Sequence, residues 1–301
     1  MIYSKEIFQI LRDGLMERRE ITILSRLFSK NTINEILEEG KSTTLNKAKE
    51  YFNIPMDMTN GEAISCCYEL LKKNYRNEYF YKNTLLNKTV FGVNTPMTAT
   101  ALTEFNTYKS KADFILLTNQ KAEVFEIKTE LDNLERVALQ IEDYYKIFSY
   151  VSIITSESNY YKTYQLFRGS SIGIKILNSR NNFTIKKEAI FNDHQLDSEA
   201  MFKSLRKSEF ETILLRHYGQ LPQTSQFQYY KECYKWFNNL NIEYLQKQTL
   251  IMLKKRNPII KNDYILDIPM ELKYLIYFSA VTKKDIKKLK IFLNNNIEED
   301  V

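Results

Sequence analysis

The hydrophobic pattern in the middle of the chain predicts an antiparallel pair of β-strands. Residues 111–118 form a nearly continuous apolar run, and a second apolar segment, residues 122–129, follows after a short polar connection. A connection of this length is typical of a β-hairpin. Asp113, the one acid of the first segment, is then expected to lie opposite the middle of the second.

The second predicted strand contains charged residues at positions where a buried strand usually has apolar ones. Side chains alternate between the two faces of a strand, so Phe125 and Ile127 share one face. Glu126 and Lys128 share the other face, together with Asp113 of the neighbouring strand. Burying an unpaired charge costs free energy, so two acids and a lysine that converge on an apolar sheet need a partner.

A divalent cation is the natural partner for this group. Mg²⁺ binds carboxylate and carbonyl oxygens and keeps several water molecules, so Asp113, Glu126 and the backbone carbonyl of Ile127 would supply part of its shell. A lysine beside the ion, Lys128, would orient or help to deprotonate an attacking water and offset charge on phosphorus. This chemistry is hydrolysis of a phosphodiester. The alternative is a surface hairpin whose Glu126 and Lys128 merely face solvent.

A helix is expected directly after the charged strand. Asp132 and Glu135 have the spacing of a capping box, and an apolar stripe with helical periodicity follows. The stripe consists of Leu134, Val137, Ile141, Tyr145 and Phe148. Gln140 and Tyr144 are four residues apart and therefore neighbours on this helix, where both could reach the charged site.

Further elements surround this centre. A long helical stretch is predicted over residues 61–86, before the hairpin. Additional strands are predicted at residues 97–108, which carry Glu104, and at residues 150–155, 171–177 and 183–187. The order of these elements indicates an α/β core.

Three regions are expected along the chain. Residues 1–59 have the pattern of several short helices, which could contact nucleic acid or cap the sheet; we favour the cap, because no recognition helix is evident. Residues 60–190 form the α/β core. Residues 195–301 are helical, with interruptions at Pro222 and Pro258.

Composition sets the outer limits. The chain has 301 residues, of which 44% are hydrophobic, enough for a buried core and about two domains. We find no apolar run near the roughly 20 residues of a membrane helix and no signal peptide, so we expect a cytoplasmic protein. Cys66, Cys67 and Cys233 have the spacing of neither a zinc site nor a disulfide framework. The two histidines, His194 and His217, argue against nucleases built on histidine.

The net charge of +6 is modest for a protein that binds nucleic acid, so the position of the charge matters more than its sum. Five lysines recur on a predicted helix near the C-terminus: Lys283, Lys284, Lys287, Lys288 and Lys290. They could follow a phosphate backbone, but a solvated helix face is the simpler interpretation. The same two interpretations apply to Lys72, Lys73 and Arg76.

Together these motifs resemble the PD-(D/E)XK nuclease superfamily. The resemblance rests on Asp113, on the Glu126-Ile127-Lys128 motif, and on a Gln-x-x-x-Tyr element formed by Gln140 and Tyr144. That element is similar to the branch related to the RecB nuclease domain and to small stand-alone bacterial and phage nucleases. The resemblance implies a restriction-endonuclease-like α/β core, a central mixed sheet flanked by helices in α-β-β-β-α-β order.

The resemblance also implies roles for residues. The two acids would bind the metal, the lysine would act at the attacking water, and the glutamine and tyrosine would help to place metal, lysine or nucleic acid. An acid of the first core helix often joins such a site; Glu78 fits this position best, and Glu104 is the alternative. No proline precedes Asp113, which departs from the motif that gives the superfamily its name.

We therefore expect a Mg²⁺-dependent nuclease in which Mn²⁺ also works, in a bacterial or phage setting. Its expected substrate is nucleic acid, DNA rather than RNA being the first choice, although the sequence does not separate the two. One alternative is a noncatalytic nucleic-acid-binding or scaffolding protein that retains the nuclease fold. Another is an RNA-directed nuclease or effector. A homo-oligomer or a protein partner is compatible with the sequence, although no dimerisation heptad is evident. No membrane partner is expected.

Overall fold

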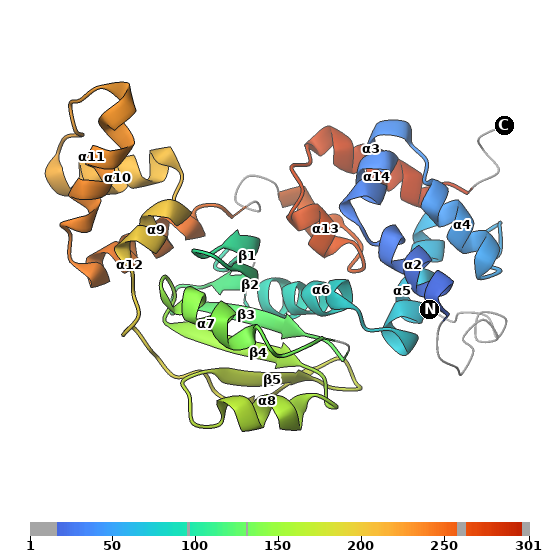
Figure 1. Ribbon diagram of the computed structural model, residues 1–301. Coiled ribbons are helices and arrows are strands. Elements are labelled where there is room, and N and C mark those ends of the chain that lie inside the picture. Colours follow the sequence, from blue (N-terminus) through green and yellow to red (C-terminus); the bar gives the residue numbers. More distant parts are fainter. Residues whose placement is uncertain (1–16, 95–96, 131, 258–262, 297–301) are drawn as a thin grey trace. The chain divides into compact units, whose positions relative to one another are not determined.

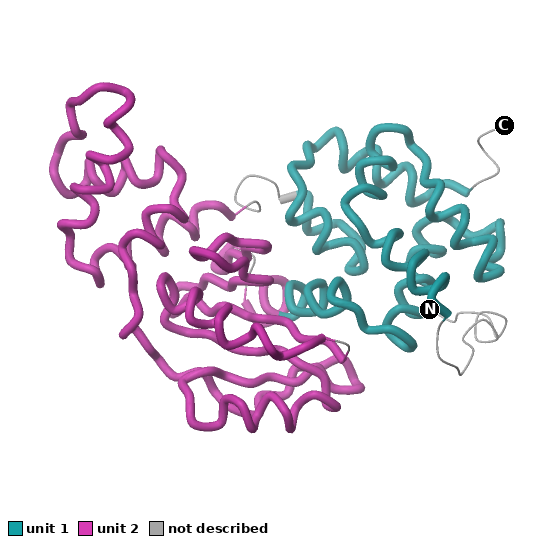
Figure 2. The backbone as a smooth tube through the Cα atoms, viewed as in Figure 1, with its two compact units in different colours: residues 1–88, 258–301 teal, residues 89–257 magenta. Residues whose placement is uncertain are grey.

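The computed structural model describes residues 17–94, 97–130, 132–257 and 263–296. The chain forms two compact units (Figure 2). The first unit combines residues 1–88 with residues 258–301, and the second contains residues 89–257. Each unit has its own buried residues and is described separately.

The second unit is built on a six-stranded mixed sheet whose strands lie side by side in chain order (Figure 1). The strands are β1 (Thr100–Asn106), β2 (Lys111–Leu117), β3 (Ala122–Lys128), β4 (Tyr150–Thr155), β5 (Gly173–Leu177) and β6 (Phe183–Lys187). Strands β1, β2 and β3 are antiparallel, β3, β4 and β5 run parallel, and β6 is antiparallel to β5. The protein is therefore a mixed α/β structure, as predicted.

The predicted hairpin is present. Phe114 pairs with Phe125, and Leu117 pairs with Ala122 beside the turn. The other predicted strands are also present, with ends that differ by a few residues from those expected. The prediction for β1 is the least accurate, because the strand begins at Thr100 and not at residue 97.

Helix α7 (Val137–Tyr145) follows β3 but begins later than predicted. Asp132 is not its cap: the carboxylate of Asp132 accepts hydrogen bonds from the backbone amide and the hydroxyl of Thr129, both at 2.7 Å. Arg136 occupies the N-cap position, but its side chain makes no hydrogen bond to the helix. The predicted stripe is correct, because Val137 and Ile141 are buried in one core with the sheet.

The remaining helices of the second unit extend this core. They are η1 (Thr89–Val93), α8 (Tyr160–Phe167), α9 (Ser198–Ser204), α10 (Lys207–Tyr218), α11 (Gln226–Asn238) and α12 (Ile242–Lys254). Phe202 and Phe237 from these helices are buried in the same cluster as Ile115 of the sheet. The break predicted at Pro222 separates α10 from α11; Pro258 lies outside the described residues.

The described part of the first unit is helical. Its helices are α2 (Arg18–Leu27), α3 (Lys30–Glu39), α4 (Thr43–Tyr51), α5 (Asn60–Asn74), α6 (Glu78–Lys88), η2 (Asp263–Asp267), α13 (Lys273–Tyr277) and α14 (Lys283–Asn294). The helical stretch predicted over residues 61–86 is present but is divided into two helices, α5 and α6. Tyr75 leaves the helical conformation with φ −152°, and the Asn77 side chain accepts a hydrogen bond from the amide of Phe80.

The two units divide the chain differently from the three predicted regions. Helix α14 contacts α3 and α5, and α13 contacts α6, so residues from both ends of the chain pack together. Helix α12, from the predicted C-terminal region, instead contacts β2. Amphipathic patterns show which face of a helix is buried but not which helix covers it. Residues 1–16 of the predicted N-terminal segment lie outside the described residues.

Predictions about the minor residue types can be compared directly. Cys66, Cys67 and Cys233 are free thiols. His194 is exposed, and the ring of His217 packs against Tyr218 and Tyr244. Across the described ranges, no helix combines the length and the hydropathy that a membrane crossing requires.

Candidate active site

Asp113 lies where strands β2 and β3 stop pairing. The ladder of the hairpin ends at the pair of Phe114 and Phe125. Beyond this pair, the backbone amide of Ile127 donates a hydrogen bond to Asp113 Oδ2 at 2.8 Å. A side-chain contact therefore replaces the backbone pairing, and it fixes the half-buried carboxylate beside the residue that follows Glu126.

Glu126 is a buried carboxylate on β3, with 1% of its side chain exposed. Its Oε2 accepts a hydrogen bond of 2.5 Å from the hydroxyl of Tyr144 on α7. Its Oε1 lies 2.7 Å from Lys128 Nζ, an ion-pair contact without hydrogen-bond geometry, and no described residue donates a hydrogen bond to it. The charge of Glu126 is therefore balanced by Lys128, while Oε1 can still accept a hydrogen bond or bind a cation.

Helix α7 supplies a second contact to the lysine. Lys128 Nζ donates a hydrogen bond to Gln140 Oε1 at 3.3 Å. Gln140 and Tyr144, four residues apart, thus contact the two charged residues of β3 from one side of α7. The sequence prediction that both side chains reach the charged strand agrees with this geometry.

Tyr144 acts here as a donor. Burial, with the charge of Glu126, raises its pKa well above the usual value, so the phenol stays protonated. Its oxygen also lies 3.0 Å from the carbonyl oxygen of Lys111. A phenol has one proton, and the shorter contact assigns that proton to Glu126.

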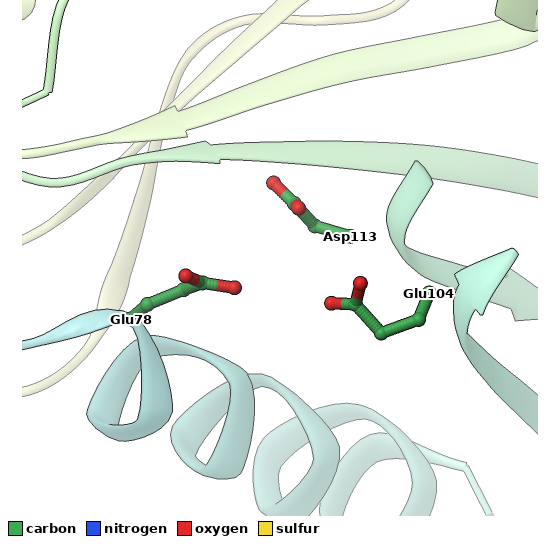
Figure 3. A group of neighbouring side chains, drawn as sticks. All are labelled: Glu78, Glu104 and Asp113. Carbon is green, nitrogen blue, oxygen red and sulfur yellow. The ribbon is translucent and has the colours of Figure 1, made fainter. Parts of the chain in front are cut away.

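Glu104 approaches Asp113 from the neighbouring strand. One carboxylate oxygen of each residue lies within 4.8 Å of the other, and Figure 3 shows both side chains extending into the same space. Glu104 has φ 50°, a left-handed conformation that is costly for a residue with a side chain. Its carboxylate is also 3.6 Å from Lys111 Nζ. The backbone of β1 is therefore distorted at the residue that brings a second acid to Asp113.

Glu78, also labelled in Figure 3, belongs to the first unit, where it begins α6. Its carboxylate lies 2.5 Å from Lys82 Nζ, one turn along the same helix. Its assignment to the site therefore stays a prediction from the sequence.

The oxygen atoms of this region suit a hard cation. Asp113 and Glu104 offer carboxylates that lie close together, and Glu126 offers a buried oxygen that accepts no hydrogen bond from the described residues. Mg²⁺ and Mn²⁺ prefer such oxygen donors to nitrogen or sulfur. The close carboxylates of Asp113 and Glu104 therefore suit such an ion. Glu126 does not belong to this group of close carboxylates, so its place in the shell stays a prediction from the sequence.

A hollow of about 930 Å³ lies beside Lys128 and Gln140. It is lined by Tyr108, Lys109, Ser110, Lys128, Asn133, Glu135, Arg136, Leu139, Gln140, Glu142, Asp143 and Lys146. Burial raises the pKa of Asp143, but hydrogen bonds from Lys146 and Ser110 outweigh it and keep the net pKa below the usual value. Among the described residues, no carboxylate lies within ion-pair distance of Lys109 or Arg136. These two cations could contact a polyanion in the hollow.

Sequence reasoning missed a second charged cluster, around Glu123. Its carboxylate contacts Lys175 at 2.9 Å, Lys121 at 2.8 Å and the hydroxyl of Ser152 at 2.6 Å. Burial raises the pKa of Glu123, yet Lys175 and the hydrogen bonds outweigh it and lower the pKa overall. Strand alternation places Glu123 on the face opposite Glu126. A charged residue on that otherwise apolar face of the strand was the feature of the sequence that could have indicated a second cluster.

A comparison with protein families gives one match. The family model of bacteriophage P4 protein cII matches residues 71–290, well over half of the chain. The chain belongs to the bacteriophage P4 protein cII family. The segment shared with the P4 cII family contains every candidate site residue from Glu78 to Tyr144 and leaves out helices α2, α3 and α4. No curated protein and no solved structure matches the chain.

Proposed function

We propose that this member of the P4 cII family is a metal-dependent nuclease that hydrolyses phosphodiester bonds in nucleic acid, with DNA as the expected substrate. The observation that carries the proposal is the contact of Lys128 with both Glu126 and Gln140, beside the fixed carboxylate of Asp113. Acids, an amine and an amide are thus gathered at the open end of a hairpin. We place this activity in the cytoplasm.

The order of elements supports a restriction-endonuclease-like core. Helix α6 is followed along the chain by β1, β2, β3, α7 and β4, which is the order that the superfamily resemblance implies. Strand β4 pairs in parallel with β3, as the crossover through α7 requires. The fold assignment remains part of the proposal.

In the proposed enzyme, Asp113, Glu126, Glu104 and the carbonyl of Ile127 hold Mg²⁺ or Mn²⁺. Glu78 is a further candidate ligand, from the sequence resemblance alone. The bound ion would polarise a phosphoryl oxygen and lower the pKa of a water molecule.

The residues of the chain supply the rest. Lys128 offers a positive charge to the phosphorus centre as negative charge develops there, and it orients the attacking water. Gln140 positions the lysine through its side-chain oxygen, and Tyr144 positions Glu126. Both act through another residue, so they are positioning residues.

One feature favours a different function. Lys128 lies within ion-pair distance of Glu126, a contact that would also suit a noncatalytic protein that binds nucleic acid with a nuclease-like fold. Manganese binding separates the two: a nuclease binds Mn²⁺ in a manner that depends on Asp113, detected by electron paramagnetic resonance. A noncatalytic protein of this kind does not.

The test of the proposal is cleavage by the full-length protein. Labelled single- and double-stranded DNA and RNA are incubated with Mg²⁺, Mn²⁺ or EDTA. We expect cleavage of DNA with either ion and none with EDTA or with the Asp113→Ala variant. Cleavage of RNA alone would favour the RNA-directed alternative. No cleavage of any substrate, together with no Asp113-dependent Mn²⁺ binding, would refute the nuclease proposal.

A further inference from the structure

A second hollow, in the first unit, lies against helices α2 and α4 and has a volume of about 790 Å³. It is lined by Arg18, Arg19, Thr22, Ile23, Arg26, Lys47, Glu50 and Tyr51. Four of these side chains are cationic and one is acidic. The hollow is therefore strongly positive, although the net charge of the whole chain is only +6.

The acids that the structure describes form no ion pairs with these four cations. Within the described ranges, no carboxylate lies within ion-pair distance of Arg18, Arg19, Arg26 or Lys47. The Glu20 carboxylate accepts a hydrogen bond from the Glu17 amide at the start of α2, and the Glu17 carboxylate accepts a long one, 3.4 Å, from the hydroxyl of Tyr51. Like charges gathered in one concave surface repel one another, and a bound polyanion would relieve that repulsion.

The lysine-rich helix α14 provides a contrast. Ile286, Leu289 and Phe292 are buried, as the sequence predicts. Lys290 pairs with Asp267, and Lys288 donates a hydrogen bond to the carbonyl of Leu37. Part of the positive charge that was conspicuous in the sequence is therefore engaged by the protein itself, whereas the cations of the α2–α4 hollow form no ion pair with a described residue.

Three of the four cations in the hollow are arginines, which suits the binding of phosphate. The chain has 32 lysines and 11 arginines, yet three of the arginines fall within residues 18–26. Arg18, Thr22 and Arg26 are spaced by four residues and so lie along one face of α2. The guanidinium of Arg19 lies over the ring of Tyr51, 5.2 Å from its centre, which restricts its orientation. Guanidinium groups bind phosphate oxygens through paired hydrogen bonds, which an ammonium does not form.

We propose that the α2–α4 hollow binds the sugar-phosphate backbone of nucleic acid. The hollow anchors the chain on nucleic acid independently of base sequence, because phosphate contacts carry no sequence information. The inference rests on the proposed function only in naming nucleic acid as the source of phosphate. The hollow lies outside the segment that matches the P4 cII family, residues 71–290.

The test measures binding without cleavage. Fluorescence anisotropy of a labelled DNA duplex in EDTA gives the affinity of the full-length protein at several salt concentrations. The test variant is Arg18→Ala/Arg19→Ala/Arg26→Ala, and all three side chains are exposed, so folding should be preserved. We expect the slope of log K against log salt to fall by roughly 2 to 3, since each phosphate contact contributes about 0.9. At moderate salt the affinity should fall at least about tenfold.

The control removes the same charge elsewhere in the same unit. Lys283→Ala/Lys284→Ala/Lys287→Ala changes three exposed residues of α14. An equal loss in both variants would overturn the proposal, because the effect would then be one of total charge. No loss in the arginine variant would also overturn it.

Two further measurements complete the test. Arg18→Lys/Arg19→Lys/Arg26→Lys keeps the charge, so the salt slope should be retained while the affinity falls. Binding to vesicles that contain anionic lipids is measured alongside; arginine-dependent binding to vesicles but not to DNA would overturn the choice of partner. Arginine-dependent DNA binding supports the anchor whether or not the protein cleaves DNA, so the two proposals fail independently.

Discussion

The hydroxyl of Tyr144 donates a hydrogen bond of 2.5 Å to the carboxylate of Glu126, joining α7 to the charged end of β3. Both side chains are almost fully buried. A hydrogen bond to a buried charge contributes more than one between neutral groups. The contact therefore stabilises the fold at the same place where it positions the proposed site.

Tyr144→Phe should lower the free energy of unfolding by about 1.5 to 3 kcal/mol, because Glu126 loses its hydrogen-bond donor in a buried setting. Urea unfolding followed by circular dichroism measures this change. Tyr161→Phe, at a tyrosine that is 68% exposed, is the matched control and should leave stability unchanged. Equal stability of the two variants would contradict the assigned contact.

Lys128→Met should abolish cleavage and also lower stability, because removing one partner of a buried ion pair costs about 3 to 5 kcal/mol. Adding Glu126→Gln should restore much of that stability without restoring cleavage. Urea unfolding of the two single variants and the double variant completes a double-mutant cycle. Additive effects would show that the two side chains do not interact, and full cleavage by Lys128→Met would exclude its proposed role.

Glu123 should make stability depend on acid pH. Its pKa is lower in the folded state than the usual 4.5, so its stabilising effect is complete above that value and is lost as the pH falls below it. Between about pH 5 and pH 3 the wild type should therefore lose stability more steeply than Glu123→Gln. Thermal melts across this range test the difference. Glu142→Gln, at an exposed position, should follow the wild type.

Glu104→Gly should remove a proposed metal ligand without the loss of folding stability that glycine usually causes in a strand. Glycine accepts φ 50° without strain, so the relief should offset its greater freedom in the unfolded chain. We expect the free energy of unfolding to stay the same or rise by up to about 1 kcal/mol, while Mn²⁺ binding weakens. The control, Asn106→Gly at an exposed position of β1, should lose about 1 kcal/mol. Similar losses at both positions would argue against strain at Glu104.

The sequence predicts the centre of the second unit well because the relevant patterns are local. Strand alternation alone places Glu126 and Lys128 on one face, and a spacing of four residues places Gln140 and Tyr144 on one side of a helix. Neither inference needs to know what packs against the strand or the helix. The structure joins the two pairs through the contacts of Lys128 and Tyr144.

Other features depend on contacts between residues far apart in sequence. Glu123 meets Lys175 only because β3, β4 and β5 are neighbours, and a pairing order of this kind is not written in any local pattern. The predicted start of α7 is wrong because more than one backbone amide lies near Asp132. Its carboxylate accepts a hydrogen bond from the amide of Thr129 and does not cap the helix. The left-handed backbone of Glu104 likewise has no signal in the residue type.

The bond between the Ile127 amide and Asp113 also bears on strand alignment. A slip of β3 by a single position along β2 would turn Glu126 and Lys128 toward the opposite side of the sheet. The hydrogen bond from the Ile127 amide to Asp113 would be lost in that slip, so it favours the observed alignment. Sequence changes that loosen the hairpin should therefore separate the charged residues of the proposed site from one another.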